Sequence, residues 1–150
     1  MSNAGRCIQA CVVGDADTGK TSLICTAAND TFDSRPPPVL PPTRLHPEFT
    51  PDHTPMLITD TSSRPEDQAA VDCVIMQADV VVVCFDATRH ATLESVRTMW
   101  YPRIQRLSPD VPVILACCKA DLLGGDKDKD PKQAALEERA NTLLREVGVV

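Results

Sequence analysis

Residues 14–21, GDADTGKT, fit the pattern G-x-x-x-x-G-K-[ST] and lie between an apolar run and a helical pattern, as this motif requires. In such a P-loop the glycines let backbone N–H groups curl around phosphate oxygens at a helix N-terminus. Lys20 supplies positive charge to the β- and γ-phosphates, and the Thr21 hydroxyl can ligate Mg²⁺. The alternative is a tight turn with an exposed lysine. The expected nucleotide-binding residues of the loop are Asp15, Ala16, Asp17, Thr18, Gly19, Lys20, Thr21 and Ser22.

Two further elements follow predicted strands. Asp60 comes directly after the run PMLIT, where P-loop proteins place an acidic residue that holds Mg²⁺, usually through water. Lys119 and Asp121 follow the apolar run 111–117 in CKAD, which resembles the N-K-x-D element of guanine-nucleotide-binding proteins. A carboxylate at Asp121 can accept hydrogen bonds from the N1 and N2 edge of guanine, which adenine does not present, while the Lys119 stem covers the base. These residues predict a preference for GTP over ATP; the alternative is a solvated turn.

Apolar runs alternate with helical patterns along the chain. Buried strands are expected at residues 7–13, 55–59, 80–85 and 111–117, and helices from residue 20 onward and at 66–77, 92–107 and 131–146. Thr92 is the expected N-cap of the third helix, which Pro102 kinks or shortens, and Asp130 and Pro131 suit the start of the last. The buried stripe of the last helix is expected to be Leu136, Ala140, Leu143, Leu144 and Val147. This order predicts an α/β P-loop NTPase fold, a doubly wound, mostly parallel sheet with helices on both faces.

Proline is concentrated in one part of the chain. Eight of the 13 prolines fall between residues 36 and 55. The segment 29–53 has no apolar period, and repeated X-Pro steps disfavour helix. We expect a loop with stiff, extended portions there, a second, charged loop at 124–132, and the beginning of another strand at 148–150.

Composition excludes several classes of protein. The 150-residue chain has 43% hydrophobic residues, 24% charged residues and a formal net charge of −6, which is typical of one folded domain. Its scattered basic residues form no stripe, so nucleic acid is not an expected partner. The longest strongly apolar run, 80–85, is far below the roughly 20 residues of a membrane-spanning helix, so no membrane contact is expected from this segment. The seven cysteines show no metal-binding spacing and are expected to be reduced thiols packed in the core.

Together these motifs resemble one family. The P-loop, the proline-rich segment, ITDTSSRPEDQ, QADVVVVCFDATRHATLESVRTMWYPRI and CKADL look like the N-terminal GTPase domain of Miro, the mitochondrial Rho family, in its plant-type form. The resemblance covers residues 6–122, and DTSSR and the W-x-P of Trp100 and Pro102 are its most specific parts. It implies a Ras-like small-GTPase fold over residues 1–150, truncated at the C-terminus before the final strand and helix.

The resemblance also implies roles for loop residues. Switch I lies within 29–53, and its Thr43 reaches Mg²⁺ in the triphosphate state; switch II covers 60–77. The implied metal ligands are Thr21, Thr43 and Asp60, and the implied catalytic residues are Lys20, Thr43 and Arg64. A loop threonine without function remains the alternative for Thr43. Arg64 has three possible roles, which are exposure to solvent, stabilisation of γ-phosphate charge and contact with a partner.

The chain departs from the family pattern at four positions. Where Ras-like proteins have D-x-x-G-Q, Ser63 replaces the glycine and Arg64 replaces the glutamine that orients the attacking water, so intrinsic hydrolysis should be slow. Ala16 takes a position usually occupied by glycine and crowds the entry of an activating protein's arginine. Cys118 replaces the asparagine that ties the base site to the P-loop, which should weaken base binding.

The primary hypothesis is a GTP-binding switch with slow Mg²⁺-dependent hydrolysis. The resemblance implies a cytosol-facing domain at the mitochondrial outer membrane that acts in mitochondrial positioning and morphology. It also implies GTP, GDP and protein regulators or effectors as partners, and a membrane tail, EF-hands and second GTPase domain outside this chain. The alternative is a catalytically silent, nucleotide-bound module that presents switch surfaces. A third possibility, a P-loop kinase of small substrates, needs a lid and substrate pocket for which the sequence offers no obvious segment.

Overall fold

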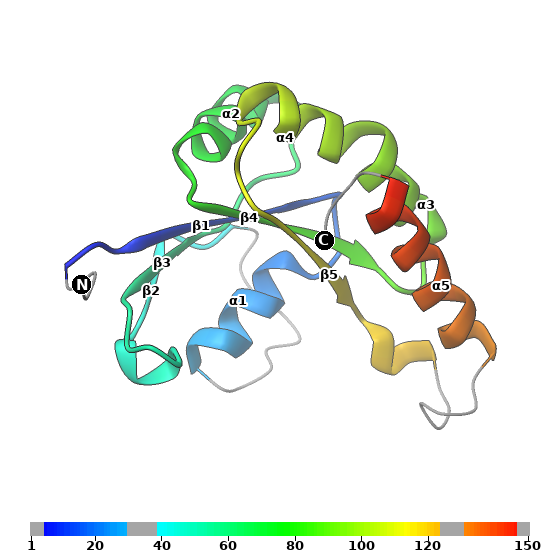
Figure 1. Cartoon of the computed structure of the whole chain (residues 1–150), viewed down its shortest axis with the longest axis horizontal. Helices are drawn as coiled ribbons and strands as arrows, with labels where there is room; N and C mark the ends of the chain where they lie inside the picture. Colours follow the sequence, from blue (N-terminus) through cyan, green and yellow to red (C-terminus); the bar gives the residue numbers. More distant parts are fainter. Residues whose placement is uncertain (1–4, 30–38, 124–130, 147–150) are drawn as a thin grey trace.

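The structure is a computed structural model that describes residues 5–29, 39–123 and 131–146. In chain order the helices and strands are β1 (Ile8–Gly14), α1 (Lys20–Asn29), β2 (Thr43–Leu45), β3 (Met56–Thr59), α2 (Gln68–Gln77), β4 (Val80–Asp86), α3 (His90–Ser95), α4 (Tyr101–Leu107), β5 (Val113–Cys118) and α5 (Pro131–Glu146) (Figure 1). Short 3₁₀ turns lie at Pro47–Phe49, Pro65–Asp67 and Ala120–Leu123, and a π-helical turn at Val96–Trp100 joins α3 to α4. None of the described helices is long and apolar enough to cross a membrane.

Five strands form one sheet in the order β2-β3-β1-β4-β5. β1 pairs in parallel with both β3 and β4, and β4 pairs in parallel with β5, whereas β2 runs antiparallel to β3. Strands with near-continuous apolar sequence suit the middle of such a sheet because both of their faces are buried. The predicted mostly parallel α/β sheet is therefore confirmed, and the carboxyl ends of β1, β3, β4 and β5 lie at one edge.

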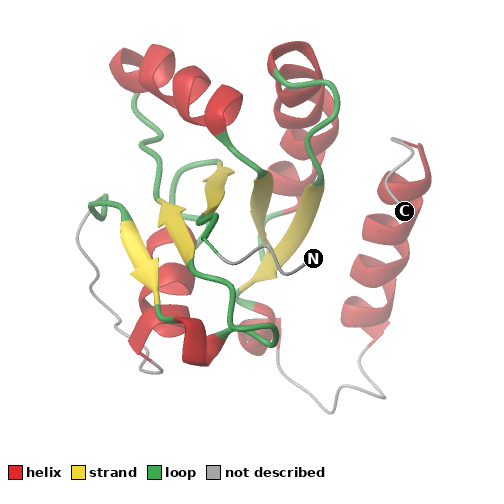
Figure 2. Ribbon diagram, turned by 60° about the vertical axis from the view of Figure 1, so that its left-hand side comes forward, coloured by secondary structure: helices red, strands yellow, loops and turns green. Residues whose placement is uncertain are grey.

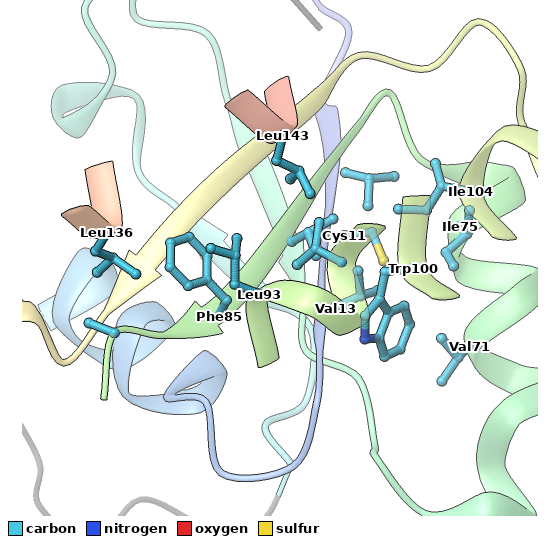
Figure 3. Close-up of a cluster of buried hydrophobic side chains, with 14 residues drawn as sticks. Cys11, Val13, Val71, Ile75, Phe85, Leu93, Trp100, Ile104, Leu136 and Leu143 are labelled. Carbon is cyan, nitrogen blue, oxygen red and sulfur yellow. The ribbon is translucent and has the colours of Figure 1, made fainter. Parts of the chain in front are cut away.

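Helices cover both faces of the sheet, as predicted (Figure 2). Alternate residues of β1 point to opposite faces, so that Cys11 and Val13 join one buried cluster and Ala10 and Val12 the other. The larger cluster includes residues of α2, α3, α4 and α5, and Figure 3 shows its central side chains. Ile24 of α1 belongs to the smaller cluster on the other face. The sheet, buried on both faces, thus positions the loops at its carboxyl edge.

The strand β2 was not predicted, because its residues fall in the segment 29–53 that was expected to be a loop. Thr43 pairs with Ile58 and Leu45 with Met56 at the edge of the sheet. A three-residue edge strand has too short a pattern to identify from sequence, since pairing with β3 rather than local propensity decides its conformation. Residues 30–38 of the same segment, and residues 124–130 of the loop predicted at 124–132, lie outside the described residues. The last two residues of that predicted loop, Pro131 and Lys132, begin α5 instead.

The predicted helix 92–107 is interrupted, and its predicted cap is wrong. The helix starts at His90 after the N-cap residue Arg89, and Thr92 lies inside α3. The Thr92 hydroxyl donates to the Arg89 carbonyl oxygen over 2.7 Å and accepts a hydrogen bond from the backbone N–H of Asp86 over 2.8 Å. Pro102 follows a π-helical turn and stands in the first turn of α4, where a proline without an N–H is tolerated. The helical run still reaches Leu107, so Pro102 does not shorten it, and a kink there stays a prediction.

The cysteines and the last helix agree with the predictions in part. All seven cysteines are free, but only Cys11 and Cys84 are buried, while Cys73 and Cys117 are exposed, so the expectation that all pack in the core is wrong. In α5, Leu136 and Leu143 are buried and Ala140 and Leu144 are half-buried. The predicted stripe residue Val147, the cap Asp130 and the predicted strand at 148–150 lie outside the described residues.

Candidate nucleotide-binding site

The loop between β1 and α1 has a backbone that depends on two glycines. Gly14 has a φ of +152°, and a Cβ added there would lie 2.4 Å from the carbonyl oxygen of Cys84 in β4. Gly19 has a φ of +99°, and a Cβ added there would lie 3.4 Å from Cβ of Cys118 in β5. Asp17 also has a positive φ, 59°. These conformations let the loop curl at the N-terminus of α1, where backbone N–H groups and the helix dipole favour an anion.

Lys20, the first residue of α1, is 7% exposed. Its Nζ donates hydrogen bonds to the carbonyl oxygens of Gly14 (3.0 Å) and Asp15 (2.8 Å) and to Oγ of Ser63 (3.1 Å). Burial lowers the pKa of Lys20, and the nearby carboxylate of Asp60 opposes that shift. The alternative of a tight turn with an exposed lysine is therefore wrong.

The end of β3 brings Asp60 next to the first turn of α1. Thr21 Oγ1 donates to Oδ2 of Asp60 over 2.6 Å, and the backbone N–H groups of Thr61 and Leu40 also donate to this carboxylate. A hydroxyl and a carboxylate are oxygen ligands of the kind that Mg²⁺ prefers, so this pair fits that ion. No group of three or more His, Cys, Asp or Glu side chains suited to a metal occurs among the described residues. An ion held here would need additional oxygen ligands, as Mg²⁺ does when it keeps several waters.

Thr43, the third predicted metal ligand, makes a different contact. It begins β2, and its hydroxyl donates to the carbonyl oxygen of Pro41 over 3.1 Å. The same segment reaches the Thr21–Asp60 pair through the backbone N–H of Leu40, which lies 3.1 Å from Asp60 Oδ2. The structure thus brings the segment to the site, while a metal contact by Thr43 stays a prediction.

Lys119 crosses from β5 to the phosphate loop. Its backbone has a φ of +60°, and its Nζ donates to the carbonyl oxygen of Asp17 and forms an ion pair with Asp86 over 3.1 Å. Asp121 lies in the following 3₁₀ turn and is exposed. A simple solvated turn is therefore wrong for Lys119. The guanine contact of Asp121 stays a prediction.

The other predicted loop residues divide into buried and exposed. Thr18 is fully buried, and its hydroxyl donates to the carbonyl oxygen of Asp15 over 2.9 Å. Ala16 and Asp17, in the middle of the loop, are exposed, and Ser22 is half-buried in α1. The phosphate loop is therefore stabilised from its buried side, where Thr18 and Lys20 donate hydrogen bonds to its carbonyl oxygens.

Comparison with known proteins identifies the family of this arrangement. Residues 9–149 match the profile of the Ras family. The chain belongs to the Ras family. It is 43% identical over 90% of its length to "Mitochondrial Rho GTPase 1" of Arabidopsis thaliana, and 41% identical over 80% to "Mitochondrial Rho GTPase 3" of the same plant. It is 33% identical over 90% of its length to "Mitochondrial Rho GTPase 1" of Mycosarcoma maydis. The chain spans about a fifth of the length of these relatives (20%, 18% and 17%). The predicted resemblance is confirmed.

Sequence reasoning missed a buried acidic residue of this Ras-family site. Asp86, at the end of β4, is 2% exposed and accepts hydrogen bonds from the backbone N–H and the hydroxyl of Thr88 (2.8 and 2.6 Å) and from Nε of Arg89 (3.0 Å). Burial alone would raise the pKa of Asp86, but these donors and Lys119 outweigh it and hold the pKa well below its ordinary value. Arg89 in turn donates to the carbonyl oxygen of Ala16 over 2.7 Å. The available signal was a lone Asp directly after a buried strand, the same signal that identified Asp60.

The sequence marked Trp100 as an apolar position of the predicted third helix and as part of W-x-P, but gave it no contact with the phosphate loop. In the structure it is 3% exposed, and its indole Nε1–H donates to Oδ1 of Asp15 over 2.9 Å. No local pattern connects these two residues, because the contact joins the first loop of the Ras-family fold to the end of the π-helical turn.

The departures in DTSSR have distinct surroundings. We call residues 62–64 the switch II turn. Ser63 contacts Lys20 through its hydroxyl, as given above. Arg64 is exposed; its backbone N–H donates to Oγ of Ser62 over 3.1 Å, and its carbonyl oxygen accepts from Nε2 of Gln68 over 2.8 Å. Arg64 is thus exposed to solvent in this structure, and its other two possible roles, stabilisation of γ-phosphate charge and contact with a partner, stay predictions.

Proposed function

We propose that this chain is the nucleotide-binding domain of a GTPase, a switch that binds GTP and GDP and hydrolyses GTP slowly with Mg²⁺. The observation that carries the proposal is the convergence of three strand ends on one phosphate loop. Lys20 bonds to the carbonyl oxygens of Gly14 and Asp15, Thr21 bonds to Asp60, and Lys119 bonds to Asp17. The names of the similar proteins support the assignment to GTP rather than ATP.

Different residues of the site would bind the phosphates, the guanine base and Mg²⁺. The phosphate loop holds the phosphates through backbone N–H groups and the Lys20 ammonium, while Lys119 and Asp121 select guanine. Thr21 and Asp60, with Thr43 as the third proposed ligand, would hold Mg²⁺, which when bound neutralises charge on phosphate oxygens. Because Lys20 is buried, its charge acts in a poorly screened environment.

The slow rate follows from the switch II turn. In-line hydrolysis needs a group that orients the attacking water, and the family uses a glutamine where this chain has Arg64. A guanidinium has no acceptor for the hydrogens of water and cannot take that role in the same way. The exposure of Arg64 favours the second candidate, a catalytically silent module that stays nucleotide-bound and presents its switch surfaces.

The names of the relatives also suggest a place in the cell. We propose that the chain acts at the mitochondrial outer membrane, facing the cytosol, in mitochondrial positioning and morphology, as one domain of a longer protein. Protein regulators and effectors would contact its switch regions. Imaging of mitochondrial distribution in cells that carry Lys20→Ala in the full-length protein tests this role; normal distribution and shape would contradict it.

Nucleotide binding is tested by displacement of a fluorescent GDP analogue. GTP and GDP should displace it and ATP should not, whereas equal displacement by ATP would contradict the guanine assignment. Lys20→Ala should lose affinity for every nucleotide, and Lys132→Ala, an exposed lysine of α5, serves as the control. Single-turnover phosphate release then separates the two candidates. Release by the wild type that Lys20→Ala abolishes identifies an enzyme, and no release over hours identifies the silent module.

A further inference from the structure

Trp100 joins the phosphate loop to α4. Its indole donates to the Asp15 side chain, and the backbone carbonyl oxygen of the same Asp15 accepts the 2.8 Å hydrogen bond from Lys20 Nζ. A buried indole N–H needs an acceptor, so this bond fixes both the ring and the loop residue that holds Lys20. Figure 3 shows the ring in the buried cluster with Val13 of β1 and Val71 of α2.

Arg103, three residues further along, ties Trp100 to α2. Its guanidinium carbon lies 5.3 Å from the centre of the Trp100 ring, within the range of a cation–π contact. The Arg103 side chain is 12% exposed and donates to Oδ1 of Asp72 (2.7 Å) and to Oε1 and the carbonyl oxygen of Gln68 (2.7 and 3.0 Å). A planar guanidinium that makes all these bonds fixes the orientation of the Gln68 side chain.

Gln68 completes the connection to the switch II turn. Its Nε2 donates to the carbonyl oxygens of Arg64 (2.8 Å) and Ser62 (3.4 Å), on either side of Ser63. Ser63 Oγ accepts the hydrogen bond from Lys20 Nζ. The contacts therefore form a closed chain, which we call the Lys20 contact chain. From Lys20 it runs through Asp15, Trp100, Arg103 and Gln68 to the switch II turn, where Ser63 contacts Lys20 again.

Lys20 is the residue of this contact chain that a bound nucleotide would contact. A lysine ammonium has three hydrogens to donate. They go to Gly14, Asp15 and Ser63, and the first two acceptors belong to the loop itself. A phosphate oxygen that binds Lys20 must therefore compete with Ser63, and this competition acts on the switch II turn and on Gln68.

We propose that Trp100 and Arg103 are positioning residues for GTP hydrolysis. They hold the switch II turn next to Lys20 and couple the ligand of Lys20 to the orientation of α2, without touching the nucleotide themselves. The inference rests on the GTPase function proposed above. It predicts that loss of either side chain slows hydrolysis while GDP affinity is nearly unchanged.

The first test uses Trp100 as its own probe, because it is the single tryptophan of the chain. Its emission is recorded for the wild-type protein with GDP and with a non-hydrolysable GTP analogue. We expect the two spectra to differ, and Arg103→Met to remove most of that difference. Arg106→Met, an exposed arginine on the same helix, should keep it. Identical wild-type spectra, or a full difference in Arg103→Met, would overturn the proposal.

The second test is a double-mutant cycle on single-turnover hydrolysis. Trp100→Phe keeps an aromatic ring but loses the N–H, and Arg103→Met keeps an unbranched apolar stem. Each should slow hydrolysis by about tenfold, and the double variant by about tenfold rather than about a hundredfold if the two act as one unit. The GDP dissociation constant should change by less than about threefold, and Arg106→Met should match the wild type. Multiplicative rate losses, or equal losses of rate and GDP affinity, contradict a shared positioning role.

Two controls keep the outcomes separate. Thermal unfolding identifies a variant that does not fold, and if Trp100→Phe does not, the emission of Arg103→Met still decides. If the wild type binds neither GDP nor GTP, the proposed function fails and the positioning role fails with it. If guanine nucleotides bind and are hydrolysed with no change in Trp100 emission, the positioning role alone fails.

Discussion

The two sides of the phosphate loop are held by different chemistry. On the side of Lys119, which we call the base side because Lys119 and Asp121 are the proposed guanine contacts, the buried carboxylate of Asp86 forms ion pairs with Arg89 and Lys119. Arg89 donates to the carbonyl oxygen of Ala16, and Lys119 donates to that of Asp17. On the other side, which faces the switch II turn and which we call the switch side, the indole N–H of Trp100 donates to the side chain of Asp15. The base side therefore depends on a buried carboxylate with two cations, and the switch side on a buried indole whose charged partners are more exposed. Acidification should act mainly on the first side, and substitutions that change the shape of the ring mainly on the second.

The largest expected difference between the two sides is in the free energy of unfolding that is lost when a carboxylate is removed. Asp86→Ala should lower the free energy of unfolding by about 3 kcal/mol, because a nearly fully buried partner of two cations is lost. Asp72→Ala, which removes the 32%-exposed partner of Arg103 on the switch side, should cost about 1 kcal/mol or less. Urea unfolding at pH 7 measures both values. Equal losses would mean that the two sides do not differ in this way.

The pH dependence of stability should separate the sides further. Hydrogen bonds from Thr88, Arg89 and Lys119 outweigh burial and lower the pKa of Asp86 in the folded state. A lowered folded-state pKa means that this stabilisation is fully present above the unfolded-state value of about 3.9 and is lost as the pH falls below it. The stability gap between the wild type and Asp86→Asn should therefore shrink from pH 6 to pH 3. A gap that widens on acidification would contradict the assignment.

On the switch side, Arg64→Gln should change the rate of hydrolysis more than nucleotide affinity. A glutamine can orient water with its carboxamide, so we expect single-turnover hydrolysis to rise by about tenfold, or about 1.4 kcal/mol in activation free energy. The GDP dissociation constant should stay within about twofold of the wild type, since Arg64 lies outside the phosphate loop. Arg64→Met is the control that changes charge without adding an amide. A larger change in affinity than in rate would place Arg64 among the binding residues.

The smallest expected effect is on the base side. Cys118→Asn restores a strong hydrogen-bond donor and acceptor beside Gly19 and should tighten GDP binding by about fivefold, near 1 kcal/mol. Cys117→Asn, at the exposed neighbouring position, should leave GDP binding unchanged. Titration with fluorescent GDP measures both. Unchanged affinity in Cys118→Asn would mean that the thiol does not weaken base binding.

The features predicted from sequence are those set by local pattern. The apolar runs predicted a mostly parallel sheet but not the order of its strands. The phosphate loop and Lys119 were identified from their motifs and Asp60 from its place directly after a strand, and all three lie at the carboxyl ends of strands. Asp86 follows a strand in the same way, but no motif distinguishes it, and the cations that explain its burial are visible only in three dimensions.

What could not be predicted depends on contacts between distant segments. β2 exists through its pairing with β3, and the Trp100–Asp15 bond joins residues from different parts of the chain. Thr92 has the right residue type for a cap, but its hydroxyl instead joins the end of β4 to the first turn of α3. Arg64 is bonded to its near neighbours Ser62 and Gln68, but the side chain of Gln68 is oriented by Arg103, which lies 35 residues further along the chain.

The close approach of Gly14 to the carbonyl oxygen of Cys84 has a consequence for the order of folding. β1 has no sequence-adjacent strand to pair with: Ile8 pairs with Met56, and Gly14 pairs with Cys84. Such long-range parallel pairings form slowly, because the entropy of closing the intervening chain must be overcome before they stabilise anything. The phosphate loop therefore acquires its final shape only when β4 has joined β1, and native-state hydrogen exchange should find the loop and these two strands opening as one cooperative unit.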